Sequence, residues 1–230
     1  MNAHGETSRS GVRAITLDVG GTLIEPWPSV GDIYAEAASG FGLTELSATQ
    51  LNSNFVSAWR SKRGFDYSEA AWLNLVAASF AQPAEDLPGG FFARLYARFT
   101  EPDAWRIFDD VLPALKALAK LPVRIAVISN WDDRLRPLLE KLELRRFFEC
   151  VTISCEVGCA KPAGEIFAAA SAQLDLQPGA ILHVGDSRRE DVEGARDAGF
   201  QAALLDRAGG SGDIDSLEKI GSLPGVKWAD

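Results

Sequence analysis

Residues 14–23 read Ala-Ile-Thr-Leu-Asp-Val-Gly-Gly-Thr-Leu, and this stretch decides the fold. Its first four residues are apolar or β-branched, which predicts a buried strand. The strand ends on a carboxylate, Asp18, and the chain then turns through Gly20 and Gly21. In an open parallel sheet, ligands bind beyond the carboxyl ends of the strands. Asp18 is therefore a candidate functional residue from its position alone.

Composition and charge limit the classes of partner. Of the 230 residues, 47% are hydrophobic and 24% are charged, which are the proportions of an ordinary soluble globular protein. The net charge of −9 argues against nucleic acid as a partner, because phosphate backbones select basic surfaces. No apolar run reaches the roughly 18–20 residues of a membrane-spanning helix, so we expect no membrane partner. A small anionic substrate remains compatible with this charge, and we expect a monomer or a homodimer.

The start of the chain and the cysteines indicate a compartment. Residues 1–11 are polar and lack the apolar segment of a signal peptide, so we expect a flexible tail there. The three cysteines are Cys150, Cys155 and Cys159. An odd number without an export signal favours a reducing compartment, and we expect a cytoplasmic protein. Neither histidine lies near the cysteines in sequence, so we expect buried strand or loop thiols and no metal site.

Apolar runs alternate with helical patterns along much of the chain. This alternation predicts an α/β fold with a doubly wound, Rossmann-like parallel sheet. The predicted strands span residues 12–17, 123–129, 148–154, 180–184 and 201–205. The predicted core helices span residues 111–120, 133–142, 163–174 and 191–198. We expect the chain after Asp206, which is rich in Gly and Ser, to pack loosely, with Trp228 as an anchor.

About a hundred residues separate the first two predicted strands, far more than one crossover connection needs. Within this stretch the sequence predicts four helices, joined by segments that contain Gly and Pro. They span residues 30–40, 47–61, 68–80 and 88–99. We therefore expect a small α-helical cap at residues 29–101, inserted into an α/β core of residues 12–28 and 102–230.

Polar residues lie beyond three further strands, at the edge of the sheet where ligands bind. Ser129 and Asn130 follow the second strand and can hold phosphoryl oxygens. Lys161 precedes a helix, and its ammonium can neutralise a bound phosphate. Asp186 follows the fourth strand, where a carboxylate can hold a divalent cation. Asp191 comes five residues later and can orient the lysine or a metal-bound water.

In their order and strand context, these residues resemble the four sequence motifs of the haloacid dehalogenase-like hydrolase superfamily. The resemblance covers residues 14–205, including the helical cap. It implies that Asp18 is the nucleophile, that Lys161 supports catalysis with its charge, and that Asp18, the backbone carbonyl of Gly20 and Asp186 bind Mg²⁺. Asp191 would act from behind these ligands. We expect the phosphoryl group and the rest of an anionic substrate to be bound by Thr22, Ser129, Asn130, Lys161 and Arg60.

One residue departs from the phosphatase branch of this superfamily. That branch carries Asp-x-Asp-Gly-Thr at the end of the first strand, and its second Asp is the general acid and base. Gly20 stands at that position here and cannot move a proton. General acid–base help is worth about 10²–10⁴-fold. We therefore expect a Mg²⁺-dependent hydrolase that acts on a small phosphorylated metabolite through an aspartyl-phosphate, with turnover slowed by the missing acid.

Other functions stay open. Phosphonate-cleaving relatives do not need this acid and form a Schiff base with a cap lysine; Lys62 is the only lysine in the predicted cap. Haloacid dehalogenases also lack the second Asp, but they need no Mg²⁺, whereas Asp186 keeps the metal-type pattern. A non-catalytic phosphate-binding or interaction protein would keep the same binding groups.

A substitute acid and further substrate contacts would come from nearby polar residues. Glu25, Asp66 and His183 are the candidates for an acid near neutral pH, although His183 is expected to be a packed strand residue. The predicted cap also carries an aromatic and cationic cluster that would lie at the rim of the site. Its members are Trp59, Arg60, Lys62, Arg63 and Phe65. The alternative is a solvated helix end with two core aromatics.

Overall fold

The computed structural model describes residues 11–62 and 64–223, and its centre is a sheet of five parallel strands. In spatial order, the strands are β5 (Val151–Ile153), β4 (Arg124–Ser129), β1 (Ala14–Leu17), β6 (Ile181–Gly185) and β7 (Gln201–Leu204). Leu17 is in register with Val127 of β4 and Val184 of β6, so the carboxyl ends of the three central strands meet at one edge. The predicted α/β fold with a parallel sheet is confirmed.

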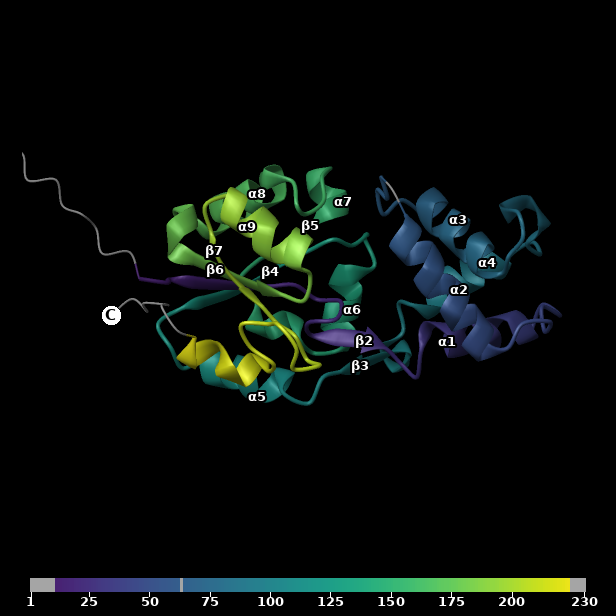
Figure 1. The fold of residues 1–230 in the computed structure, drawn as a ribbon, viewed down its shortest axis with the longest axis horizontal. Helices are drawn as coiled ribbons and strands as arrows, with labels where there is room; N and C mark the ends of the chain where they lie inside the picture. Colours follow the sequence, from purple (N-terminus) through teal and green to yellow (C-terminus); the bar gives the residue numbers. More distant parts are fainter. Residues whose placement is uncertain (1–10, 63, 224–230) are drawn as a thin grey trace, which may run out of the picture.

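Helices cover both faces of this sheet (Figure 1). They are α5 (Val111–Leu118), α6 (Leu135–Lys141), α7 (Ser154–Val157), α8 (Gly164–Leu174) and α9 (Gly194–Asp197). Side chains alternate along β1: Ile15 and Leu17 pack into one apolar core with α5 and α6, and Ala14 packs into the other with α8 and α9. Because both faces are covered, the central strands are buried and mostly apolar on both sides, as the sequence pattern indicates.

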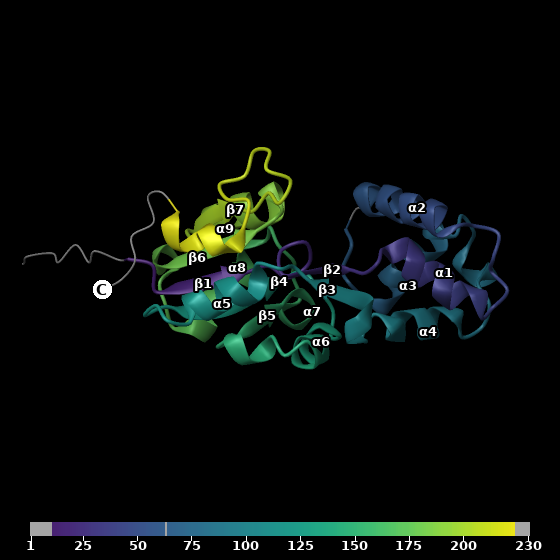
Figure 2. The same cartoon turned by 90° about the horizontal axis from the view of Figure 1, so that it is seen from below.

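The remaining helices form a separate lobe, which we call the cap (Figures 1 and 2). It contains α1 (Val30–Ser39), α2 (Ala48–Ser61), α3 (Glu69–Ser79) and α4 (Phe91–Arg98). The cap has an apolar core of its own, which buries Tyr34, Phe91 and Leu95. A helical region is thus present where the sequence predicts one. The exact division at residues 28/29 and 101/102 remains a prediction.

Two short strands connect the cap to the core, and the sequence patterns did not predict them. β2 (Ile24–Pro26) precedes the cap and β3 (Trp105–Ile107) follows it. They pair in antiparallel orientation, with Pro26 opposite Trp105. The chain therefore enters and leaves the cap at the same place.

Beyond Asp206, residues 208–213 are exposed, in line with the predicted loose packing, but the chain then packs back onto the core, which was not predicted. Leu217–Ser222 forms a 3-10 helix, and both Leu217 and Ile220 are buried in the core beside α5. Asp110 accepts a hydrogen bond from the backbone N–H of Leu217 at 2.7 Å. Apolar residues three positions apart are enough to bury one side of a short helix, even in a segment rich in Gly and Ser. The predicted anchor Trp228 and residues 1–10 of the predicted tail lie outside the described residues.

None of the helices in the described part of the chain combines the length and the apolar character that a membrane crossing requires.

Candidate active site

Asp18 lies at the centre of the edge where β1, β4 and β6 end. Its side chain is buried, and its Oδ1 atom accepts hydrogen bonds from Lys161 Nζ at 2.7 Å and from Ser129 Oγ at 3.2 Å. The backbone N–H of Asp18 bonds to Val184 O of β6, which continues the sheet pairing by one residue and fixes the carboxylate. Three predicted site residues from three different segments therefore meet at one oxygen atom.

Lys161 is a buried cation rather than a surface lysine, with 3% of its surface exposed. Besides Asp18, its ammonium contacts Asp191 Oδ1 at 2.6 Å and the backbone carbonyl of Ile128 at 3.0 Å. Burial alone would lower the pKa of Lys161, but the charges of Asp18 and Asp191 outweigh it and raise the pKa above its ordinary value. Lys161 therefore keeps a positive charge at the sheet edge.

Asp191 supports this lysine from inside a helix. The helix predicted at residues 191–198 begins earlier, as a π-helical turn over Arg188–Glu193 that Ser187 caps, and it continues into α9. Burial favours a raised pKa for Asp191, but the charge of Lys161 and the hydrogen bond from His183 hold the pKa below its ordinary value. Its second oxygen accepts a bond from the Ser187 N–H at 2.8 Å.

His183 is a packed strand residue, as expected. It is fully buried in β6, where its ring lies between Thr16 Oγ1 at 2.9 Å and Asp191 Oδ1 at 3.1 Å. Burial lowers the pKa of His183, which keeps the ring neutral. The histidine thus positions Asp191 and does not face a substrate.

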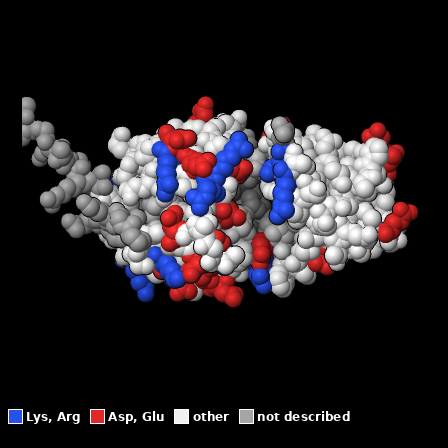
Figure 3. All heavy atoms as spheres, viewed as in Figure 1, with Lys and Arg blue, Asp and Glu red and all other residues white. Residues whose placement is uncertain are grey.

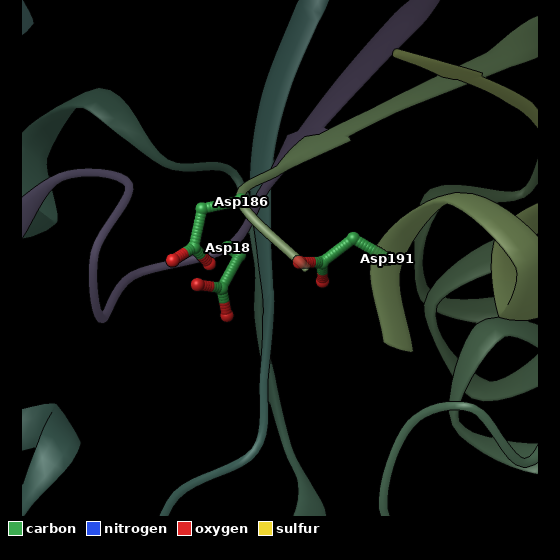
Figure 4. A group of neighbouring side chains, drawn as sticks. All are labelled: Asp18, Asp186 and Asp191. Carbon is green, nitrogen blue, oxygen red and sulfur yellow. The ribbon is translucent and has the colours of Figure 1, made fainter. Parts of the chain in front are cut away.

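Three carboxylates come together at this edge and have the chemistry of a divalent-cation site. Oxygen atoms of Asp18, Asp186 and Asp191 all lie within 4.8 Å of one another, and Figure 4 shows their carboxylates converging. Asp191 already has both oxygens engaged by protein donors, which leaves Asp18 and Asp186 as the available pair. Asp186 is exposed at the edge of the cavity, but desolvation of its carboxylate and the charges of Asp18 and Asp191 raise its pKa to about 7. A bound cation would relieve this repulsion, so the residues present fit Mg²⁺.

Gly21 is required for this arrangement. Its φ is +78°, and a Cβ atom at this position would lie 2.3 Å from Asp186 Oδ2. The turn after β1 therefore leaves room for the carboxylate of Asp186 beside Asp18.

Asn130 braces the loops around Lys161. Its side chain accepts a hydrogen bond from the Lys161 N–H at 2.6 Å, and its amide donates to Lys161 O at 3.0 Å and to Glu190 Oε2 at 3.2 Å. It lines the cavity, as Ser129 does, but these bonds engage its amide. Thr22, also expected to bind phosphate, is fully buried and is absent from the residues that line the cavity.

A cavity of about 1380 Å³ opens between this edge of the core and the cap. Asp18, Ser129, Lys161 and Asp186 line its floor. Figure 3 shows the hollow between the two lobes, with basic side chains on both sides of it. The cavity is large enough for a small-molecule substrate whose phosphate rests at the sheet edge.

The space above Gly20 is taken by an aromatic ring. A Cβ atom at position 20 would lie 3.3 Å from Cζ3 of Trp131, closer than ordinary van der Waals contact. Trp131 packs against Trp105, with 5.2 Å between the ring centroids. Both indoles line the cavity, so an aromatic surface stands beside the position without a side chain.

The predicted substitute acids do not reach the cavity. Glu25 forms an ion pair with Arg106 in the β2–β3 hairpin, and Asp66 is exposed and accepts a bond from the Ser68 N–H. Neither of them lines the cavity, nor does His183.

Glu190 and Tyr67 are two of the cavity residues that the sequence patterns did not indicate. Glu190 lines the cavity beside Asn130, and burial raises the pKa of its carboxyl. Tyr67 is a buried cap residue on the cavity wall. Glu190 directly precedes Asp191 in the sequence, and this position could have indicated that it lies near the site. No sequence pattern indicates that Tyr67 reaches the cavity.

The aromatic and cationic cluster of the cap does lie at the cavity. Trp59, Arg60, Lys62 and Phe65 all line it, and Arg63 is outside the described residues. Lys62 Nζ lies 3.5 Å from the ring centroid of Trp59. The two aromatics are half-buried and face the cavity, which differs from the alternative of core aromatics beneath a solvated helix end.

The cysteines take no part in this site. All three are free thiols; Cys150 and Cys159 are half-buried, but Cys155 is exposed, so the expectation of buried thiols is wrong for Cys155. Cys155 is the second residue of the short helix α7, which begins at Ser154 where the sequence predicted a strand. Among the residues the structure describes, the metal-type cluster is made of carboxylates alone.

Comparisons with known proteins agree with this geometry. The family profile for haloacid dehalogenase-like hydrolases matches residues 12–199. The bovine haloacid dehalogenase-like hydrolase domain-containing protein 3 is 32% identical over 206 residues, which cover 84% of this chain and 82% of that protein.

Two solved structures share the fold. An HAD phosphatase from Thermococcus onnurineus aligns with a TM-score of 0.69 and 23% identity, covering 95% of this chain and all of that one. A HAD hydrolase from Bacillus subtilis bound to magnesium aligns with a TM-score of 0.73 and 16% identity, covering 92% and 98% of the two chains. At such identities these structures show the fold alone. Taken with the profile match and the bovine relative, they lead to one conclusion: the chain belongs to the haloacid dehalogenase-like hydrolase family.

Proposed function

We propose that this protein is a Mg²⁺-dependent phosphohydrolase that acts on a small phosphorylated metabolite with Asp18 as its nucleophile. The observation that carries the proposal is the buried ammonium of Lys161, 2.7 Å from Asp18 and 2.6 Å from Asp191 at the floor of a cavity. A buried ion pair often contributes little to the stability of a fold, because the cost of removing both charges from water offsets their attraction. Phosphoryl transfer, in contrast, depends on fixed charges of this kind.

The residues suit a two-step reaction. The carboxylate of Asp18 attacks phosphorus, and the bond from phosphorus to the leaving oxygen breaks with its electron pair on that oxygen. Ser129 Oγ and Lys161 Nζ converge beside the attacking carboxylate, from where they can donate to phosphoryl oxygens. Water then attacks the acyl-phosphate, which releases phosphate and restores Asp18.

Asp18 and Asp186, with the backbone carbonyl of Gly20, are the groups that we propose to hold Mg²⁺. The ion, when bound, would neutralise charge on the phosphoryl oxygens. Asp191 and Lys161 would maintain the floor of the site by fixing Asp18 in place, because Asp191 Oδ1 and Asp18 Oδ1 share the same ammonium.

We infer that Gly20 occupies the position of the general acid and leaves this site without one. Leaving groups that depart as stable anions would then react fastest, because they need no proton in the transition state. Hydrolysis of esters with poor leaving groups would be slow.

The proposed substrate is small and anionic. Arg60, Lys62 and Arg189 line the cavity and supply positive charge around the acidic floor. The proposed setting is the cytoplasm, which suits three free thiols.

A second candidate function is favoured by Lys62. Burial lowers the pKa of this cap lysine, and its ammonium lies on the face of Trp59 in the cavity wall. A neutral amine there would form a Schiff base with the carbonyl of a phosphonoaldehyde. Treatment of the protein with a phosphonoaldehyde and borohydride would reduce this Schiff base to a stable adduct. An unchanged protein mass after that treatment would rule this function out.

The primary proposal is tested by hydrolysis of an aryl phosphate with Mg²⁺ and with excess chelator. We expect chelation to abolish turnover and Asp18→Asn to lower it by at least about 10³-fold, as expected for a lost nucleophile. The matched control is Asp66→Asn, which removes an exposed cap carboxylate outside the cavity lining and should keep wild-type activity. Wild-type turnover by Asp18→Asn would overturn the proposal.

A further inference from the structure

The cap side of the cavity carries many aromatic rings, which we call the aromatic wall. Its members are Phe55, Trp59, Phe65, Trp72, Phe92 and Tyr96. Trp59 stacks on Phe55 and on Trp72, with interplanar angles of 18° and 17°, and Phe65 meets the edge of Trp72 at 4.9 Å between centroids. These rings are half-buried, so part of the wall remains accessible to a ligand, with Lys62 Nζ covering one face of Trp59.

One charged group beside this wall, Arg134, is committed to protein partners. Arg134 is buried, and its guanidinium donates to both carboxylate oxygens of Asp132, at 2.8 and 2.6 Å. The same guanidinium covers the ring of Tyr96 at 3.5 Å. The rings of Phe55, Phe65 and Phe92 offer no hydrogen-bonding group, so hydroxyl groups of a sugar or another polyol placed against them would lose their hydrogen bonds, which costs binding energy. A planar apolar group would bury its surface against the rings.

The floor of the site favours the same kind of group for a separate reason. Beside Gly20, where no side chain can protonate the leaving oxygen, the indole of Trp131 fills the space. A phenol-type oxygen has a pKa of about 10, as in tyrosine, whereas water, a guide to alkyl alcohols, has a pKa of about 16. A phenolate therefore leaves without a proton far more easily than an alkoxide does.

We propose that the substrate class of this site is a small aryl phosphate, a phosphate monoester of a phenol-type hydroxyl. The inference rests on the proposed phosphohydrolase function and adds the identity of the leaving group. Asp18 forms its bond to phosphorus as the phosphorus–oxygen bond of the ester breaks. The electron pair stays on the phenol oxygen, and the phenolate takes its proton from water after it has left.

The substrate arm of the test compares phenyl phosphate with cyclohexyl phosphate, a similar ring that is neither aromatic nor a good leaving group. We expect kcat/KM to be at least about 10²-fold higher for phenyl phosphate. The binding arm compares phenylphosphonate with methylphosphonate, two inhibitors that the site cannot hydrolyse as esters. We expect phenylphosphonate to bind about tenfold tighter, which is the size of one aromatic contact.

Variants assign this preference to the wall. Trp59→Leu and Phe65→Leu, tested separately in case one of them disturbs the cap, should each weaken phenylphosphonate about tenfold and leave methylphosphonate unchanged. Trp27→Leu is the matched control, because this indole is 44% exposed and does not line the cavity. It should alter neither inhibitor.

The outcomes separate this inference from the function on which it rests. If both esters are hydrolysed but the two phosphonates bind equally well, the aryl inference is overturned and the phosphohydrolase proposal stands. If phenylphosphonate binds tighter and neither ester is hydrolysed, the phosphohydrolase proposal is overturned, and the aryl substrate is overturned with it.

Discussion

Gly20→Asp should convert this site into one that hydrolyses alkyl phosphates. The new carboxyl group would supply the proton that an alkoxide needs as it leaves. General acid help of about 10²–10⁴-fold corresponds to about 2.7–5.4 kcal/mol of transition-state stabilisation, at about 1.36 kcal/mol for each tenfold.

The structure sets the cost of this substitution. The added Cβ would lie 3.3 Å from Cζ3 of Trp131, a few tenths of an ångström inside the ordinary contact distance. Trp131 is half-buried and rests on Trp105, so the indole must shift by a few tenths of an ångström, and we take a cost of about 1 kcal/mol, the size of a modest side-chain distortion. The net gain for cyclohexyl phosphate should therefore be about 10- to 10³-fold.

The assay measures kcat/KM of wild type, Gly20→Asp and Gly20→Ala on cyclohexyl phosphate and phenyl phosphate with Mg²⁺. Gly20→Ala makes the same contact with Trp131 but carries no acid, so the ratio of Asp to Ala variant isolates proton donation. This ratio should be about 10²–10⁴ for the alkyl ester and close to one for the aryl ester. A ratio near one for both esters, in variants that still hydrolyse phenyl phosphate, would show that position 20 does not face the leaving oxygen.

Three further outcomes are expected. Mg²⁺ should raise the Tm, and this increase should become larger as the pH rises through about 7, because Asp186, whose pKa is about 7, must lose its proton to bind the ion. Asp186→Asn should abolish the increase in Tm, and the same increase in this variant as in wild type would refute the proposed metal site. Lys161→Met should lower the free energy of unfolding in urea by about 3–5 kcal/mol, because Asp18 and Asp191 would remain as buried charges without a counter-ion; a loss below about 1 kcal/mol would contradict this. Arg134→Met should speed amide hydrogen exchange in α4, since Arg134 donates a hydrogen bond to Tyr96 O at 3.1 Å and its guanidinium covers the Tyr96 ring. The control is Arg136→Met, because Arg136 forms an ion pair with Glu156 of the α/β core and not with the cap. Equal effects of the two variants would argue that Arg134 does not hold the cap.

Sequence patterns predicted the parts of this molecule that depend on neighbours along the chain. The apolar run at residues 14–17 marks β1, and similar runs mark the other sheet strands. Polar residues at their ends, such as Asp18 and Ser129, meet because parallel strands share one edge. The sequence could therefore bring together most of the floor of the site before any distance was known.

The features that escaped prediction depend on contacts between distant segments. Trp131 meets Gly20 across 111 positions of sequence, and Tyr67 reaches the cavity from the cap. Neither contact leaves a periodic pattern in the sequence. The buried 3-10 helix near Leu217 was overlooked for another reason: its apolar residues are few, and the Gly and Ser residues around them hid their spacing.

The two strands that connect the cap and the core have a consequence for how such an enzyme changes. Pro26 and Trp105 lie opposite each other in the antiparallel pair of β2 and β3, so the two ends of the cap segment are one interstrand spacing apart. An inserted segment whose two ends lie side by side does not require the core to change its conformation. The entropic cost of closing such a loop also grows only slowly with its length. The nucleophile, the lysine and the acidic cluster all belong to the sheet edge, whereas the aromatic wall arrives with the insert. A different insert joined at the same two strands would bring a different substrate pocket to the same catalytic residues. The two junctions, at Pro26 and Trp105, lie side by side in space, so the exchange would leave the core unchanged.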